Sequence, residues 1–197
     1  MTKRIDFLFW SNKVSLVLLS CLLVLMFGPV TSPGFSRELD KVLIDYDAVF
    51  KEGLKRRGKL LNLSGKKIGD EGVKRLIASG VLEKVEKIDL RYNEITSVGV
   101  EFLAKMPPLP KLRVLILRHN IIGDAGSIAL AGSDSFPNLE EIQLGWTETR
   151  DAGALAFGSS DKFKNLKKLD LRGNFLANKT KEELKKSLGH LKTLKLF

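Results

Sequence analysis

Cysteine and histidine are nearly absent from this chain of 197 residues. The single cysteine, Cys21, lies in an apolar segment, so a disulfide framework is excluded and packing alone must hold the core. The two histidines, His119 and His190, lie in different segments, and their spacing does not indicate a metal site. The sequence also has no P-loop, no Gly-x-Gly-x-x-Gly motif and no serine–histidine–aspartate arrangement. We therefore predict a protein that is not an enzyme and that uses no cofactor or metal ion.

Acidic residues are outnumbered by basic residues, 23 to 33, which gives a net charge of +10. Outside residues 1–36 the balance is 30 basic to 22 acidic residues, or +8. This excess favours acidic partners or anionic surfaces through long-range attraction. It does not indicate specific nucleic-acid binding, because lysine-rich surfaces are common for solubility alone. Hydrophobic residues make up 44% and charged residues 28% of the chain, which is typical of a globular domain.

Residues 1–36 have the order of a secretory signal, in which a basic start precedes an apolar run and small residues. The three parts are Lys3, Arg4 and Lys13, then residues 14–30, then Thr31-Ser32-Pro33-Gly34. Two alternatives remain open. The run of 17 residues is just long enough for an uncleaved membrane anchor, and Leu18-Leu19-Ser20-Cys21 resembles a loose lipoprotein signal. All three predict that the rest of the chain is exported, whether secreted, periplasmic or extracellular, or held at a membrane through residues 14–30.

A repeat of 27 residues organises the rest of the chain. A Leu/Ile-x-Leu unit recurs at this spacing, and a sixth unit ends 25 residues after the fifth. The last leucine of each unit, which we call the anchor, is Leu63, Leu90, Leu117, Leu144, Leu171 and Leu196. The alternation within each unit predicts a strand with two buried side chains. The apolar residues that follow, three and four apart, predict a helix with one buried side. One such unit cannot bury its apolar face alone, so we expect the units to stack.

The pattern Leu112-x-x-Leu115-x-Leu117-x-x-Asn120-x-Ile122-x-x-x-Gly126-x-x-x-Leu130 resembles leucine-rich repeats. The 27-residue length is similar to the ribonuclease-inhibitor-like subclass, and the resemblance covers roughly residues 58–197 as five repeats and a final strand. It implies an α/β solenoid, a short curved horseshoe with parallel strands on the concave face and helices on the convex face. It also implies a ladder of hydrogen bonds from an asparagine column, here Asn93, Asn120 and Asn174, imperfect where Lys66 and Thr147 replace asparagine.

The sequence also predicts a helix before the repeats and the start of the last helix. Residues 37–57 carry apolar side chains on one stripe, and we expect them to form an N-terminal capping helix over the open end of the core. An independent amphipathic membrane helix is the alternative, although four acidic residues make this segment a poor match for an anionic membrane. Near the other end, Thr180-Lys-Glu-Glu183 predicts a capping box at the start of the last helix.

The residues around each anchor are expected to project from the concave face and to bind a protein partner. Arginine and aromatic side chains recur there, and these residue types are enriched at binding hot spots. An alternative is that these positions vary freely because nothing packs on them. The predicted contact residues are Asp89, Arg91, Tyr92, Ile116, Arg118, His119, Gln143, Trp146, Asp170 and Arg172. We predict a non-catalytic protein-interaction module; the alternative function is an envelope-associated structural protein that docks its basic surface on anionic lipid or polysaccharide.

Overall fold

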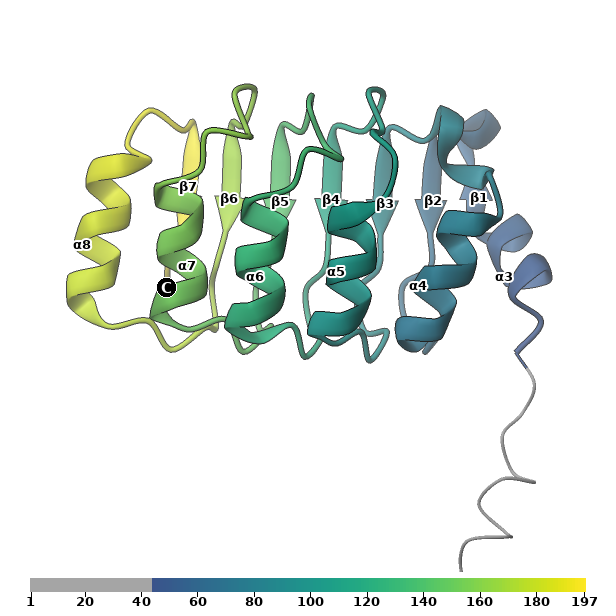
Figure 1. The fold of residues 1–197 in the computed structure, drawn as a ribbon, viewed down its shortest axis with the longest axis horizontal. Coiled ribbons are helices and arrows are strands. Elements are labelled where there is room, and N and C mark those ends of the chain that lie inside the picture. The colour runs from purple at the N-terminus through teal and green to yellow at the C-terminus, as the bar shows by residue number, and fades with distance from the viewer. Residues whose placement is uncertain (1–43) are drawn as a thin grey trace, which may run out of the picture. The chain divides into compact units, whose positions relative to one another are not determined.

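The computed structural model describes residues 44–197. The predicted signal or anchor over 1–36 and the first part of the predicted capping helix, 37–43, lie outside the described residues. The described residues form an α/β solenoid in which a strand and a helix alternate (Figure 1). The strands are β1 (Leu54–Lys55), β2 (Leu60–Asn62), β3 (Lys87–Asp89), β4 (Val114–Ile116), β5 (Glu141–Gln143), β6 (Lys168–Asp170) and β7 (Thr193–Lys195). The helices are α3 (Tyr46–Gly53), α4 (Gly69–Ala78), α5 (Ser97–Lys105), α6 (Gly123–Ala131), α7 (Asp151–Gly158) and α8 (Asn178–Ser187), with 3₁₀ turns at Arg56–Gly58 and Val81–Lys84.

The sheet has the order β1 to β7, and every pair from β2 to β7 is parallel. From β2 to β6 each residue pairs with the residue 27 positions further on, as in Leu61 with Ile88 and Ile88 with Leu115. The last pair, Leu169 with Leu194, is 25 apart. The repeat length and its shortened final unit therefore set the register, and the predicted solenoid is confirmed.

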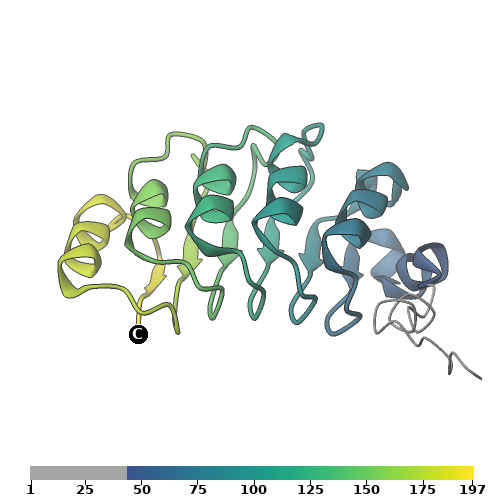
Figure 2. The ribbon, with the colours of Figure 1, turned by 60° about the horizontal axis from the view of Figure 1, so that its bottom comes forward.

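The helices cover one face of the sheet and leave the other face open, as Figure 2 shows. The side chains at the centres of β2 to β6 and the anchors after them are buried in the layer between sheet and helices. Each helix from α4 to α8 adds one buried side chain thirteen residues after the anchor, and these are Leu76, Leu103, Leu130, Phe157 and Leu184. The result is one continuous core rather than a core per repeat. We call the face away from the helices the open sheet face.

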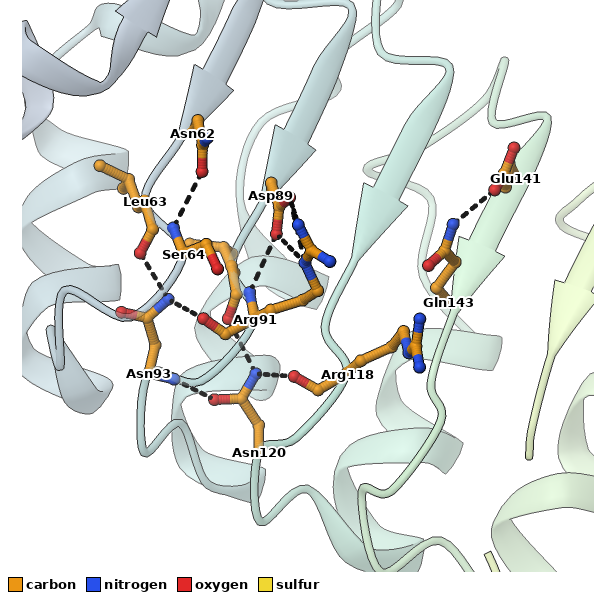
Figure 3. A network of polar contacts seen from close by, with 11 residues as sticks. Asn62, Leu63, Ser64, Asp89, Arg91, Asn93, Arg118, Asn120, Glu141 and Gln143 are labelled. Atoms are coloured by element: carbon orange, nitrogen blue, oxygen red, sulfur yellow. Dashed lines mark hydrogen bonds and ion pairs between the residues drawn. The ribbon is translucent and has the colours of Figure 1, made fainter. Parts of the chain in front are cut away.

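The asparagine ladder links each repeat to the one before it. Nδ2 of Asn93 donates to the carbonyl of Leu63 at 2.8 Å, and Nδ2 of Asn120 donates to that of Leu90 at 2.9 Å (Figure 3). Oδ1 of Asn120 also accepts from the amide of Asn93 at 3.0 Å. Thr147 is too short for this role, and its hydroxyl bonds the carbonyl of Leu144 in its own repeat at 2.7 Å. The ladder is imperfect in the fourth repeat, as the threonine predicts.

Aspartates from one repeat cap the helix of the next, a feature that the sequence analysis missed. Oδ1 of Asp70 accepts from the amides of Thr96 and Gly99 at the start of α5. Oδ1 of Asp124 accepts from the amides of Arg150 and Gly153 at the start of α7, both at 2.8 Å. A Cβ on Gly153 would lie 2.6 Å from that oxygen, so the buried glycine permits the close approach.

The predicted capping box at Thr180 is wrong. Helix α8 begins two residues earlier, at Asn178, and its N-cap residue Ala177 makes no side-chain cap. The carboxylate of Asp151 supplies the cap instead, because it accepts from the amide of Ala177 at 2.9 Å. Thr180 is buried and lies within the first turn of α8, so it is not the N-cap residue that a capping box requires.

The segment before the repeats differs from the helix predicted over 37–57. Helix α3 ends at Gly53, and Leu54–Lys55 forms strand β1, antiparallel to β2. Arg56 and Arg57 have left-handed backbone conformations, with φ of 51° and 57°, which no α-helix contains and which turn the chain back along the sheet. Phe50 of α3 is buried in the core, so the described part of the segment covers the first end of the solenoid.

Candidate interaction surface

One position in each repeat, two residues after the anchor, holds a left-handed backbone at the end of every strand from β2 to β6. These residues are Gly65, Tyr92, His119, Trp146 and Gly173, with φ between 54° and 72°. The amide of each of the first four donates to a carbonyl of the next repeat, at 2.8 to 3.2 Å. A left-handed conformation costs roughly 1–2 kcal/mol for a residue other than glycine. Three successive aromatic residues adopt this conformation, and because their backbones are equivalent, their side chains leave the sheet at the same place in each repeat.

The three rings form a stack, which we call the aromatic row: Tyr92, His119 and Trp146. The ring centroids of Tyr92 and His119 are 4.2 Å apart at an interplanar angle of 8°, and those of His119 and Trp146 are 4.9 Å apart at 10°. Tyr92 is 51% and Trp146 43% exposed. The indole ring continues over the next repeat, where a Cβ on Gly173 would clash with it. Three of the predicted contact residues therefore lie together as one surface although they span 55 residues of sequence.

His119 is the middle ring, and its pKa is lowered from the ordinary value. Burial between its neighbours is the main cause, followed by the positive charges of Arg118 and Arg91. The imidazole is therefore neutral at pH 7, and the row presents a flat, uncharged surface between two exposed rings.

A second column, one residue after the anchor, carries arginines. Arg91 donates two hydrogen bonds to the carboxylate of Asp89, from Nε to Oδ1 at 2.9 Å and from Nη2 to Oδ2 at 2.7 Å (Figure 3). Arg172 donates the same two hydrogen bonds to the carboxylate of Asp170, at 2.9 and 2.6 Å. Burial alone would raise the pKa of Asp170, but the hydrogen bonds from the Arg172 side chain and amide lower it overall. These two arginines are neutralised within their own repeats.

Three of the predicted contact residues are not available to a partner. Asp89 and Asp170 are 5% and 7% exposed, because their carboxylates fold under the arginines that they bind. Ile116 is 4% exposed and lies in register between Asp89 and Gln143. Adjacent strands are only about 4.8 Å apart, so side chains of the flanking columns cover a residue in the middle of the sheet. Expecting these three to project into solvent was wrong.

Gln143 is half-buried, and its amide donates to Glu141 on the same strand at 2.6 Å. The remaining predicted residues, Arg91, Arg118 and Arg172, are half-buried, with part of each side chain reaching the open sheet face.

Arg118 differs from the other two arginines because Ile116 stands where they have an aspartate. Its guanidinium carbon lies 4.9 Å from the centre of the Trp146 ring. The side chain extends toward β5 rather than back along its own strand (Figure 3). Gly145 leaves room for it, since a Cβ there would lie 3.4 Å from Nε of Arg118. Within residues 44–197, no carboxylate lies within ion-pair distance of Arg118.

A surface hollow adjoins Trp146 on the side of the last repeats. It is lined by Trp146, Glu148, Thr149, Arg150, Gly173 and Phe175. Phe175 is 93% exposed, the most exposed large apolar side chain among the described residues. Phe175 was not among the predicted contact residues. A phenylalanine directly after the asparagine column, where other repeats have Glu94, Ile121 and Glu148, is the signal in the sequence that marks it.

The comparisons with known proteins agree with this architecture. The family model described as Leucine Rich repeat matches residues 81–104 and 109–131, which are parts of two successive units of the observed solenoid. The chain is a leucine-rich repeat protein. Such repeats suggest a protein-interaction module and are generally non-catalytic. No curated protein matches this leucine-rich repeat protein. Its assignment to the ribonuclease-inhibitor-like subclass stays a prediction.

Within residues 44–197, no group of three or more histidine, cysteine, aspartate or glutamate side chains is placed to hold a metal ion. Over the same residues, none of the helices has both the length and the apolar character needed to cross a bilayer.

Proposed function

We propose that this leucine-rich repeat protein is a non-catalytic interaction module that binds a protein partner on its open sheet face, centred on the aromatic row and Arg118. The observation that carries the proposal is the stack of Tyr92, His119 and Trp146 with the Arg118 guanidinium over its last ring. Tryptophan, tyrosine and arginine are the residues that most often dominate binding energy at protein interfaces. Their side chains here are already ordered, so a partner would not have to order them at its own cost.

The backbone supports the same conclusion. Left-handed residues other than glycine cost free energy, and they cluster at binding sites in proteins generally. Stacking between aromatic rings returns about 0.5–1.5 kcal/mol per pair, which offsets only part of this cost. The same left-handed conformation occurs in the repeat turns at Lys67, Glu94 and Glu148, so it belongs to the turn itself. What supports recognition is that three successive turns carry exposed, stacked rings where Gly65 and Gly173 show that glycine would avoid the cost.

A photoreactive phenylalanine analogue in place of Tyr92, introduced into the full chain in its native cell, tests the proposal. We expect it to crosslink to a discrete protein that mass spectrometry identifies. The matched control carries the same analogue in place of Lys105, which is exposed on α5 on the opposite side of the solenoid. Equal crosslinking from both positions, or none from position 92, would contradict a partner on the open sheet face.

We also propose that the protein is exported from the cytoplasm. The support is the order of basic, apolar and small residues in 1–36. N-terminal sequencing of protein from the native cell should begin near Phe35 or Arg37 if the segment is cleaved, whereas Met1 in a membrane fraction would indicate an anchor. Met1 in the soluble cytosol would contradict both.

A further inference from the structure

The open sheet face carries three arginines in one column, and among residues 44–197 Arg118 is the one of the three that makes no ion pair. Arg91 and Arg172 each hold a buried carboxylate through two nitrogens. Two repeats lie between them: in the first, Ile116 stands in the place of the acid, and in the second, Gln143 does. The third arginine, Arg118, follows Ile116 and so has no aspartate on its own strand to pair with.

The surroundings of Arg118 leave its charge partly desolvated. Nε of Arg118 is the one buried side-chain nitrogen or oxygen within residues 44–197 that has no hydrogen-bond partner. No hydrogen bond from the two terminal nitrogens is found among residues 44–197 either, and neither nitrogen is fully buried. One side of the guanidinium is covered by Trp146 at 4.9 Å. A cation over an aromatic ring keeps a fixed orientation, and a planar guanidinium in this state presents two parallel donors.

Trp146 also borders the surface hollow described above. The indole ring and the fully exposed Phe175 ring both border the hollow, and Gly173 contributes no side chain that would fill it. Two charged residues, Glu148 and Arg150, also line the hollow and have opposite signs. The charges of Glu148 and Arg150 sum to zero, and two exposed aromatic rings border the hollow, so we expect it to accept an apolar side chain.

We propose that the partner presents a carboxylate to Arg118 and an apolar side chain to the hollow between Trp146 and Phe175, so that the recognised element is an acidic–apolar segment of a protein. This inference rests on the proposed function and adds the chemistry of the partner to it. Trp146 joins the two sites, because it covers the guanidinium and forms one wall of the hollow. The basic excess outside residues 1–36, +8, favours the approach of such an acidic segment.

A display library of random 12-residue peptides, selected against the immobilised full chain, tests the proposal. We expect the recovered peptides to be enriched in aspartate or glutamate close to a large apolar residue. The variant Arg118→Glu should lose the acidic preference and favour lysine or arginine instead. The control Lys74→Glu changes the net charge by the same amount on the exposed side of α4 and should recover the acidic peptides unchanged.

Two more variants separate the halves of the site. Phe175→Ala removes a side chain that contacts solvent on most of its surface, so folding is unaffected, and it should remove the apolar preference while keeping the acidic one. Arg118→Lys keeps the charge but loses the two parallel donors, so a selected peptide should bind about tenfold more weakly with its acidic preference intact. This variant also distinguishes a lost charge from a lost fold, as does a thermal unfolding curve recorded for each variant.

Peptides without acidic enrichment, an acidic preference that survives Arg118→Glu, or no recovered peptides at all would overturn the inference. The proposed function fails by a different observation, namely the absence of a crosslinked protein at position 92. A discrete crosslinked partner together with a library that shows no acidic preference would leave the module in place and refute only the carboxylate at Arg118.

Discussion

Truncation of one anchor leucine tests the strand register, on which the assignment of every surface residue depends. Leu117 is fully buried at the end of β4, in the middle of the solenoid. Its replacement by alanine removes three buried carbon atoms and leaves a cavity, which costs about 2–5 kcal/mol. For a domain of this size that loss lowers the midpoint of thermal unfolding by roughly 4–20 °C. Circular dichroism of the purified full chain against temperature measures the shift.

Arg118, the next residue, provides the matched control. Its side chain reaches the open sheet face, makes no ion pair among residues 44–197 and leaves Nε without a partner. Arg118→Ala should therefore change the free energy of unfolding by only about 0.5 kcal/mol. Equal losses at positions 117 and 118, or a larger loss at 118, would refute the assignment of inward and outward side chains.

Two further predictions concern the glycine at the end of the aromatic row and two aspartates whose pKa is lowered. Gly173→Ala should destabilise the protein more than Gly65→Ala, because both glycines have φ of +72° but only at Gly173 would the new Cβ meet the Trp146 ring; equal losses in urea unfolding would contradict that ring position. Acid should weaken the fold below about pH 4. The lowered pKa of Asp170 and Asp151 means that they stabilise the protein above the ordinary aspartate pKa and lose this contribution as the pH falls through their folded values. A urea midpoint that rises between pH 5 and pH 2 would contradict this sign.

The repeat made the fold predictable because one requirement recurs at every unit. Each anchor must be buried between sheet and helix, and a shift of one residue would expose all of them together. The asparagine ladder was predictable for a similar reason. An asparagine at this position, such as Asn120, has equivalent backbone carbonyls beside it in every unit.

The surface was harder to predict because its details depend on contacts between units. Whether Asp89 reaches solvent is decided by how Arg91 folds over it, and alternation along the strand contains no information about that choice. The aspartate caps join residues 26 to 29 positions apart, so a search for capping motifs within each helix could not find them. Helix α3 ends at Gly53, before strand β1 and the left-handed turn at Arg56 and Arg57, although the apolar stripe continues to Leu54.

The central claim is that the open sheet face is the binding surface. The most direct test is the affinity of the Trp146→Ala variant for the partner that the crosslinking identifies. Trp146 supplies the largest exposed ring of the row, stacks on His119 and covers Arg118. We predict a loss of about 2 kcal/mol, or roughly thirtyfold in Kd, with a nearly unchanged unfolding midpoint. Lys105→Ala should alter neither quantity. Unchanged partner binding after loss of both Trp146 and Arg118 would contradict the account and place the binding surface elsewhere on the protein.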